Sequence, residues 1–67
     1  MPRAITILAP GFEETEAITV IDLLRRGAIT VTILGLSSRE ISGSHQITLI
    51  ADALLADFKQ PFLNVAE

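Results

Sequence analysis

The residues best placed to do chemistry are three glutamates near the start of the chain, Glu13, Glu14 and Glu16. At roughly 100° per residue, Glu16 falls about a quarter-turn from the centre of the apolar helix stripe that follows. This predicts a carboxyl at the lip of the core, just beyond the first strand, where open α/β sheets bind ligands. The alternative is a first-turn acid that only stabilises the helix dipole. Glu13 and Glu14 are expected to be solvated or to order the loop.

The other polar residues form weaker candidates. His45 is the only histidine and Ser44 precedes it. Because adjacent residues of a strand point to opposite faces, we do not expect a nucleophile and base here, and we expect His45 at the surface or at a subunit contact. Asp52 and Asp57 lack partners at metal-ligand spacing. Residues 10–11 form a single-glycine turn rather than a nucleotide-binding loop, so we predict neither a metal site nor a cofactor.

A short apolar run comes before the glutamates. Residues 4–9 are too few and too evenly apolar for an amphipathic helix, and three of them are β-branched. This pattern is typical of a strand buried on both faces of a parallel sheet. Pro10 and Gly11 are expected to end it, because proline lacks an N–H donor and glycine permits a sharp turn.

The apolar period changes to that of a helix from about Glu13. Basic residues in the last turn complement the acids of the first, and Gly27 suits the C′ position that ends a helix. Ile18 and Leu23 fall outside the apolar stripe on opposite flanks, which predicts a second partner for the helix. The stripe itself consists of Ala17, Val20, Ile21 and Leu24.

Strand-like segments follow the helix. Residues 29–35 alternate threonine with valine or isoleucine and predict a second strand, parallel to the first and reached by a right-handed helical crossover. A polar connector then holds a short strand at residues 40–41, and residues 46–50 form a third apolar run.

The last third of the chain predicts a short helix. Asp52 is expected to be the N-cap of a helix over residues 53–58, which Pro61 would end. Residues 62–65 are apolar enough to begin another strand.

Composition limits the class of protein. The chain has 67 residues and no cysteine, 49% of it is hydrophobic, and its mean hydropathy is +0.52. Because a domain this small buries only about 60% of its unfolded surface, we expect it to be part of something larger. The net charge of -3 argues against a nucleic-acid or anionic-membrane surface. No leader or spanning segment is evident, which predicts a cytosolic protein.

Several of these residues carry a resemblance. The run from residue 7 to residue 33 resembles the N-terminus of the ThiJ/PfpI superfamily, in the branch of the Parkinson-disease-associated protein deglycase and its bacterial relatives. The later segments 43–47 and 51–52 resemble the strand pair of that family. The matching motif positions are Ala9, Gly11, Glu13, Glu14, Glu16, Asp22, Leu23, Leu24, Arg25, Arg26 and Gly27.

The resemblance implies a fold and a chemistry. It implies that residues 1–67 are the N-terminal fragment of one flavodoxin-like α/β/α sandwich with a mainly parallel sheet, normally a homodimer. In the family a cysteine follows a later strand and a first-helix glutamate hydrogen-bonds it; here the matching residue is Glu16. A carboxyl beside a thiol controls its ionisation and oxidation. The activities implied are conversion of methylglyoxal, deglycation of glyoxal adducts, and chaperone action under oxidative stress.

The chain departs from the family pattern because it has no cysteine and ends before the expected nucleophile turn. We therefore expect the fragment alone to be inactive. Two hypotheses stay open: an N-terminal piece completed by the remainder of its fold or by a second chain, or a non-catalytic remnant with an interaction or chaperone-like role. A third is an unrelated flavodoxin-like module, which flavin binding would support.

Overall fold

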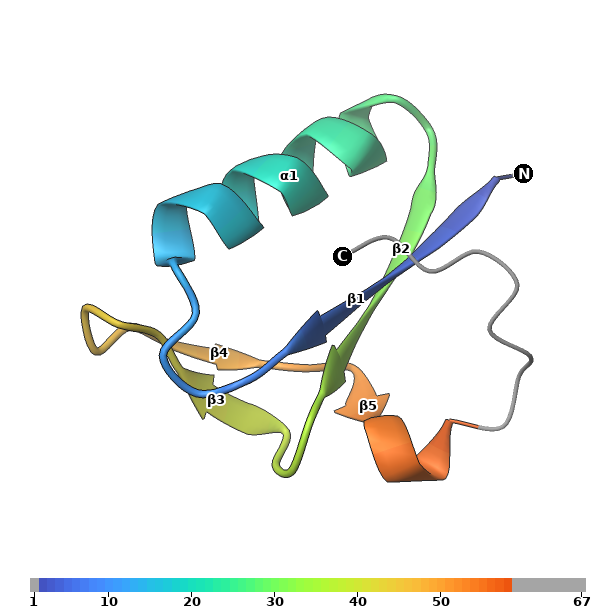
Figure 1. Cartoon of the computed structure of the whole chain (residues 1–67). Helices are drawn as coiled ribbons and strands as arrows, with labels where there is room; N and C mark the ends of the chain where they lie inside the picture. Colours follow the sequence, from blue (N-terminus) through green and yellow to red (C-terminus); the bar gives the residue numbers. More distant parts are fainter. Residues whose placement is uncertain (1, 59–67) are drawn as a thin grey trace.

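The structure is a computed structural model that describes residues 2–58. Its elements form two small sheets and a helix (Figure 1). They are, in chain order, β1 (Arg3–Leu8), α1 (Glu14–Arg26), β2 (Thr30–Gly35), β3 (Glu40–Ser42), β4 (Thr48–Ile50), β5 (Ala53–Leu54) and the single-turn 3-10 helix η1 (Leu55–Asp57).

The larger sheet confirms the predicted parallel α/β fold. Its strands lie in the order β1-β2-β5, and both pairs are parallel. β1 and β2 run in register from Arg3↔Thr30 to Leu8↔Gly35, joined by the α1 crossover. The second sheet is the antiparallel pair β3-β4, which confirms the strand expected around residues 40–41 and places another within the third apolar run.

Apolar side chains fill two clusters. The first lies between α1 and the larger sheet, around Ala4, Ile21 and Val31. The second joins the end of β1 to the small sheet and includes Leu8 and Ile41. Ala4 and Leu8 are four residues apart in β1 and therefore point to the same face of the sheet, so the two clusters follow one another along the strand.

The helix covers the sheet less completely than its stripe predicts. Ile21 is buried, and Ala17 and Leu24 pack against the clusters. Val20 was expected in the core but is 52% exposed, because no described segment covers the α1 flank beside β1. Leu23 lies in the open at 62% exposure, in keeping with its position off the stripe.

The C-terminal end of α1 corrects one prediction. Gly27 is the C-cap with φ of -85°, and the next residue, Ala28, has the left-handed φ of 64°. Ala28 N–H donates to the Arg25 carbonyl and Ile29 N–H to the Leu24 carbonyl, at 3.1 and 3.0 Å. These two bonds define a Schellman motif with Ala28 at C′, so the glycine lies one residue before the position that favours it.

Replacing Ala28 with glycine is expected to stabilise the chain by about 1 kcal/mol. The left-handed conformation costs a residue with a Cβ about 1–2 kcal/mol, partly offset by the larger entropy that glycine loses on folding. Urea denaturation followed by circular dichroism measures the change, since the chain has no Trp or Tyr for fluorescence. An unchanged or lower urea midpoint for Ala28→Gly would contradict the assignment.

The predicted helix over residues 53–58 is wrong. Residues 53–54 form β5 and pair with Leu34 and Gly35 of β2, and only the single turn η1 follows. Asp52 caps no helix: its carboxylate accepts from the Ile33 N–H at 2.8 Å, while its own N–H donates to the Ile33 carbonyl at 2.8 Å. Pairing with the sheet therefore overrides the local helix pattern. Pro61 and the strand expected at 62–65 lie outside the described residues.

Within residues 2–58, no helix is long and apolar enough to span a bilayer.

Candidate active site

An open groove runs between β1 and the first turns of α1. Thr6, Ile7 and Leu8 of the strand form one wall, and the other is made by the helix and its N-cap. Its volume is about 250 Å³, enough for a small molecule or a few side chains. The residues on the helix side are Glu13, Glu16, Ala17 and Val20.

Glu16 lies where its spacing in the sequence indicates. It is exposed at the groove beside the carboxyl end of β1, the position from which open α/β sheets contact ligands. Glu13 shares the groove and is also the helix N-cap, with its Oε1 accepting from the Thr15 N–H at 3.0 Å. The catalytic role of Glu16 stays a prediction, because geometry alone assigns it no reacting partner.

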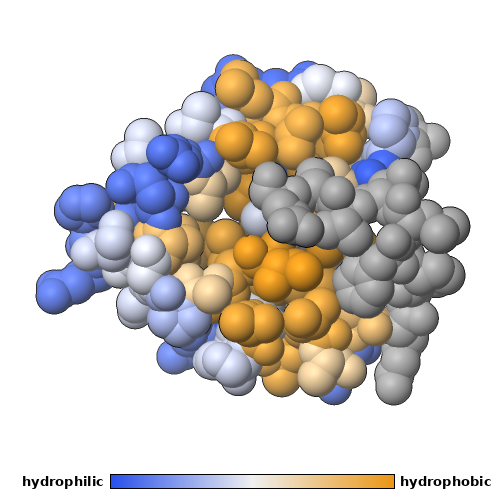
Figure 2. All heavy atoms as spheres, in the orientation of Figure 1, coloured by the Kyte–Doolittle hydropathy of each residue, from blue (hydrophilic) through white to orange (hydrophobic). Residues whose placement is uncertain are grey.

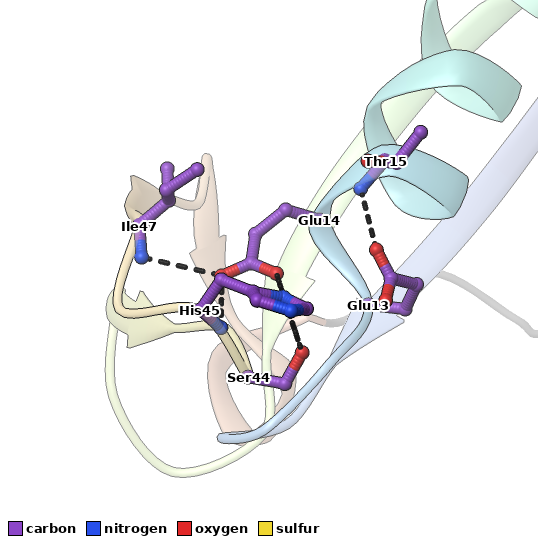
Figure 3. A network of polar contacts seen from close by, with 6 residues as sticks. All are labelled: Glu13, Glu14, Thr15, Ser44, His45 and Ile47. Atoms are coloured by element: carbon purple, nitrogen blue, oxygen red, sulfur yellow. Dashed lines mark hydrogen bonds and ion pairs between the residues drawn. The ribbon is translucent and has the colours of Figure 1, made fainter.

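Glu14 has a different environment and was not foreseen as a site residue. It is 3% exposed, so the expectation of a solvated acid is wrong and that of a loop-ordering acid describes it better. Its side chain points into the turn between β3 and β4 (Figure 3). Oε2 accepts from the backbone N–H groups of His45 at 2.7 Å and Ile47 at 3.2 Å, and Oε1 accepts from the Ser44 hydroxyl at 3.3 Å.

These contacts explain the acidity of Glu14. Burial by itself raises the pKa of the carboxyl. Hydrogen bonds from the backbone N–H groups of Glu14, His45 and Ile47, and from the His45 ring, outweigh burial and lower the pKa from 4.5 to about 2. Hydrogen bonds to the charged form favour that form. Glu14 is therefore a carboxylate throughout the neutral range and holds the turn in place.

Ser44 and His45 also correct the sequence analysis. They lie in the turn after β3 rather than on a strand, so they do not point to opposite faces: Ser44 Oγ lies 3.1 Å from His45 Nδ1. The same Nδ1 lies 3.1 Å from Glu14 Oε1. A hydrolytic triad uses one ring nitrogen for the nucleophile and the other for the acid, whereas here both contacts meet at Nδ1. His45 is exposed at the surface, as expected.

Within residues 2–58, one group of side chains has the spacing to hold a metal ion, and it includes Glu14. Ligand atoms of Glu13, Glu14 and His45 all lie within 4.8 Å of one another. Both oxygens of Glu14 are already hydrogen-bond acceptors, however. A cation would have to displace those donors, so these contacts favour a structural role for Glu14.

Gly43 lets the turn approach the helix so closely. A Cβ at this position would lie 2.4 Å from Glu14 Cδ, well inside van der Waals contact.

The sequence contained one signal that Glu14 and Glu16 have different environments. Side chains two residues apart on a helix point about 200° apart around its axis. Glu14 and Glu16 must therefore face opposite flanks of α1 and cannot serve the same site.

Comparison with known proteins identifies the family of the chain. The model of the DJ-1/PfpI family matches residues 2–65. The chain belongs to the DJ-1/PfpI family. It is 39% identical over 56 residues to the Parkinson disease protein 7 homolog of Danio rerio, and this match covers 82% of the chain and 30% of that relative. It is 44% identical over 54 residues to protein dj-1beta of Drosophila melanogaster, covering 79% and 29%.

Solved structures give the same result. The crystal structure of a cysteine-to-alanine mutant of a DJ-1 superfamily protein from Salmonella typhimurium has a TM-score of 0.82 and 43% identity, and the match covers 85% of this chain and 31% of that one. The chain thus spans about 30% of the length of the relatives it matches, and it corresponds to the N-terminal part of the DJ-1 fold.

Proposed function

We propose that this chain is the N-terminal part of a cytoplasmic deglycase or glyoxalase-type stress-response protein. The substrate class is small dicarbonyls, methylglyoxal or glyoxal adducts, and the nucleophile is a cysteine supplied from outside these 67 residues. Membership of the DJ-1/PfpI family supports this proposal. The chain alone is inactive, since it has no cysteine.

The observation that carries the proposal is the position of Glu16. Glu16 lines the groove with Ile7 and Leu8 at the carboxyl end of β1 and is exposed to solvent there. A thiol placed there would meet a carboxyl able to accept or return its proton, and the thiolate is the reactive form. We assign Glu16 this catalytic role.

The test is reconstitution. The chain is co-expressed with the part of the Salmonella relative that lies beyond the matched region, with the cysteine that the crystallised mutant lacks restored. Loss of methylglyoxal is followed. Glu16→Gln is expected to reduce the rate about 100-fold, the usual contribution of a positioned acid or base. The matched control is Glu13→Gln, which removes a charge from the same groove and should change the rate less than about threefold. Equal effects of the two substitutions would refute a specific role for Glu16.

A second candidate is a non-catalytic remnant with an interaction or chaperone-like role, favoured by the exposure of Ile18, Ile47 and Ile50. Apolar surface of this kind is characteristic of contact sites.

We also propose that the complete assembly is a homodimer. Ile18→Asp should then halve the mass measured by light scattering, and an unchanged mass would exclude this residue from the contact.

A further inference from the structure

The outer side of β2, away from β1, is only partly covered by a strand. β5 pairs with the last two residues of β2, whereas β1 pairs with the whole of it (Figure 1). The N–H groups of Thr30 and Leu36 donate to carbonyls on the β1 side. Since residues two apart in a strand direct their backbone groups to the same side, those of Val31 and Ile33 point to the outer side, where β5 does not reach.

Side chains from two other segments occupy this outer side. Arg25, in the last turn of α1, donates from its guanidinium to the Val31 carbonyl at 2.9 Å. Asp52, which directly precedes β5, accepts from the Ile33 N–H through its carboxylate and donates its own N–H to the Ile33 carbonyl, both at 2.8 Å. The guanidinium and the carboxylate lie 4.0 Å apart, and both are about half exposed. They therefore take hydrogen-bond positions that a further strand would use.

The segment beneath these side chains has the composition of strands that pair between chains. Residues 29–35 carry no charge and no proline, and every residue from Ile29 to Ile33 is β-branched. Uncharged segments of about seven residues with high β propensity stack readily against copies of themselves. Charged side chains at a strand edge oppose this, because an incoming strand must displace and desolvate them.

We propose that Arg25 and Asp52 block the outer edge of β2 against strand addition, and that the strand they exclude is β2 of a second copy of the chain. The composition of residues 29–35 identifies this occupant. The two contacts explain why the edge is closed in the folded chain, since they satisfy the outward-facing backbone groups that a second copy would bind. The inference is independent of the proposed reaction, because neither residue lines the groove that contains Glu16.

The first test is Arg25→Ala, which frees the Val31 carbonyl. It also removes one positive charge from a chain of net charge -3, so electrostatic repulsion between copies increases and cannot cause association. The matched control is Arg26→Ala. It makes the same change of charge one residue away but removes only an exposed ion pair with Asp22.

The second test compares two substitutions of Asp52 that change the charge equally. Asp52→Ala leaves the Ile33 N–H without its side-chain acceptor. In Asp52→Asn the amide oxygen can still accept from this N–H. A difference between the two variants therefore reports the hydrogen bond and not the charge.

Two other causes of association need their own control. Loss of a hydrogen bond destabilises the chain, and unfolded chains also associate. Ile21→Val shortens a buried side chain between α1 and the sheet, so it lowers the urea midpoint but leaves the β2 edge intact. Figure 2 shows apolar side chains gathered over the upper and central part of one face. Contact between copies through that face does not involve the outer backbone groups of β2.

Association is measured by sedimentation velocity over a series of concentrations, and amide exchange at Val31 and Ile33 is measured by NMR on the same samples. We expect Arg25→Ala and Asp52→Ala to associate at a concentration at least about tenfold lower than wild type, which corresponds to roughly one good hydrogen bond. Exchange at both amides should slow as these two variants associate. The variants Arg26→Ala, Asp52→Asn and Ile21→Val should behave as wild type.

Three results would overturn the proposal. In the first, the variants that open the edge associate no more than their matched controls. In the second, Ile21→Val associates as strongly as Arg25→Ala, so that association follows stability alone. In the third, association leaves exchange at Val31 and Ile33 unchanged, which would assign the contact to the apolar face.

Discussion

Replacing Glu14 with alanine should lower the melting temperature of the chain by roughly 10 °C. The substitution leaves the N–H groups of His45 and Ile47 and the Ser44 hydroxyl without their acceptor. These hydrogen bonds are part-buried, and losing about 1 kcal/mol for each lowers the melting temperature of a domain of this size by several degrees. Thermal unfolding followed by circular dichroism measures the effect.

A pH series separates the charge of Glu14 from its packing. The pKa of this carboxyl is about 2 in the folded chain and 4.5 when unperturbed, so ionisation stabilises the fold above about pH 5. That contribution is lost as the pH falls from about 5 to about 2. Glu14→Gln keeps the shape without the charge, and its stability should vary less with pH across this window. Parallel curves for the two proteins would contradict the assignment.

Two controls make the Glu14 result specific. Glu40→Gln removes an exposed carboxyl from β3 and should leave the melting temperature within experimental error.

The second control is at Gly43. Gly43→Ala places a Cβ 2.4 Å from Glu14 Cδ and should destabilise the wild type strongly. In the Glu14→Ala variant, the Cβ added at position 43 occupies space left by the Glu14 side chain. It should therefore lower the free energy of unfolding little. Additive effects in this double-mutant cycle would show that the two residues do not interact.

The second large effect is expected at Gly35, the last residue of β2. A Cβ there would lie 1.9 Å from the Ser38 carbonyl oxygen and 3.2 Å from Ile41 Cδ1. The backbone must shift to admit it, since the oxygen has no rotamer by which to move away. We expect Gly35→Ala to reduce the free energy of unfolding by about 3 kcal/mol or more.

Gly27→Ala is the matched control. A Cβ at Gly27 meets only carbonyl oxygens at 3.5 and 3.6 Å, and its φ of -85° suits any residue. The free energy of unfolding from urea denaturation should therefore stay within about 0.5 kcal/mol of wild type. If Gly35→Ala were as mild as this control, the connection after β2 would have to differ from the one described.

Local pattern was enough to predict the parallel β-α-β unit and the place of Glu16. An evenly apolar run followed by a 3.6-residue period specifies strand and helix through contacts that lie close in the chain. The same periodicity puts Glu16 on the flank beside β1. These features need no knowledge of distant segments, and the structure shows the elements where they were expected.

Only the tertiary structure determined the burial and hydrogen-bond partners of Glu14, Asp52 and Val20. Glu14 is buried because a turn thirty residues later brings its N–H groups to the helix start. Asp52 bonds to β2 instead of starting a helix. Val20 is exposed because no described strand covers its side of α1. The sequence by itself determined the local elements, whereas partners far apart in the chain determined which polar groups were buried, since burial depends on what packs against a residue.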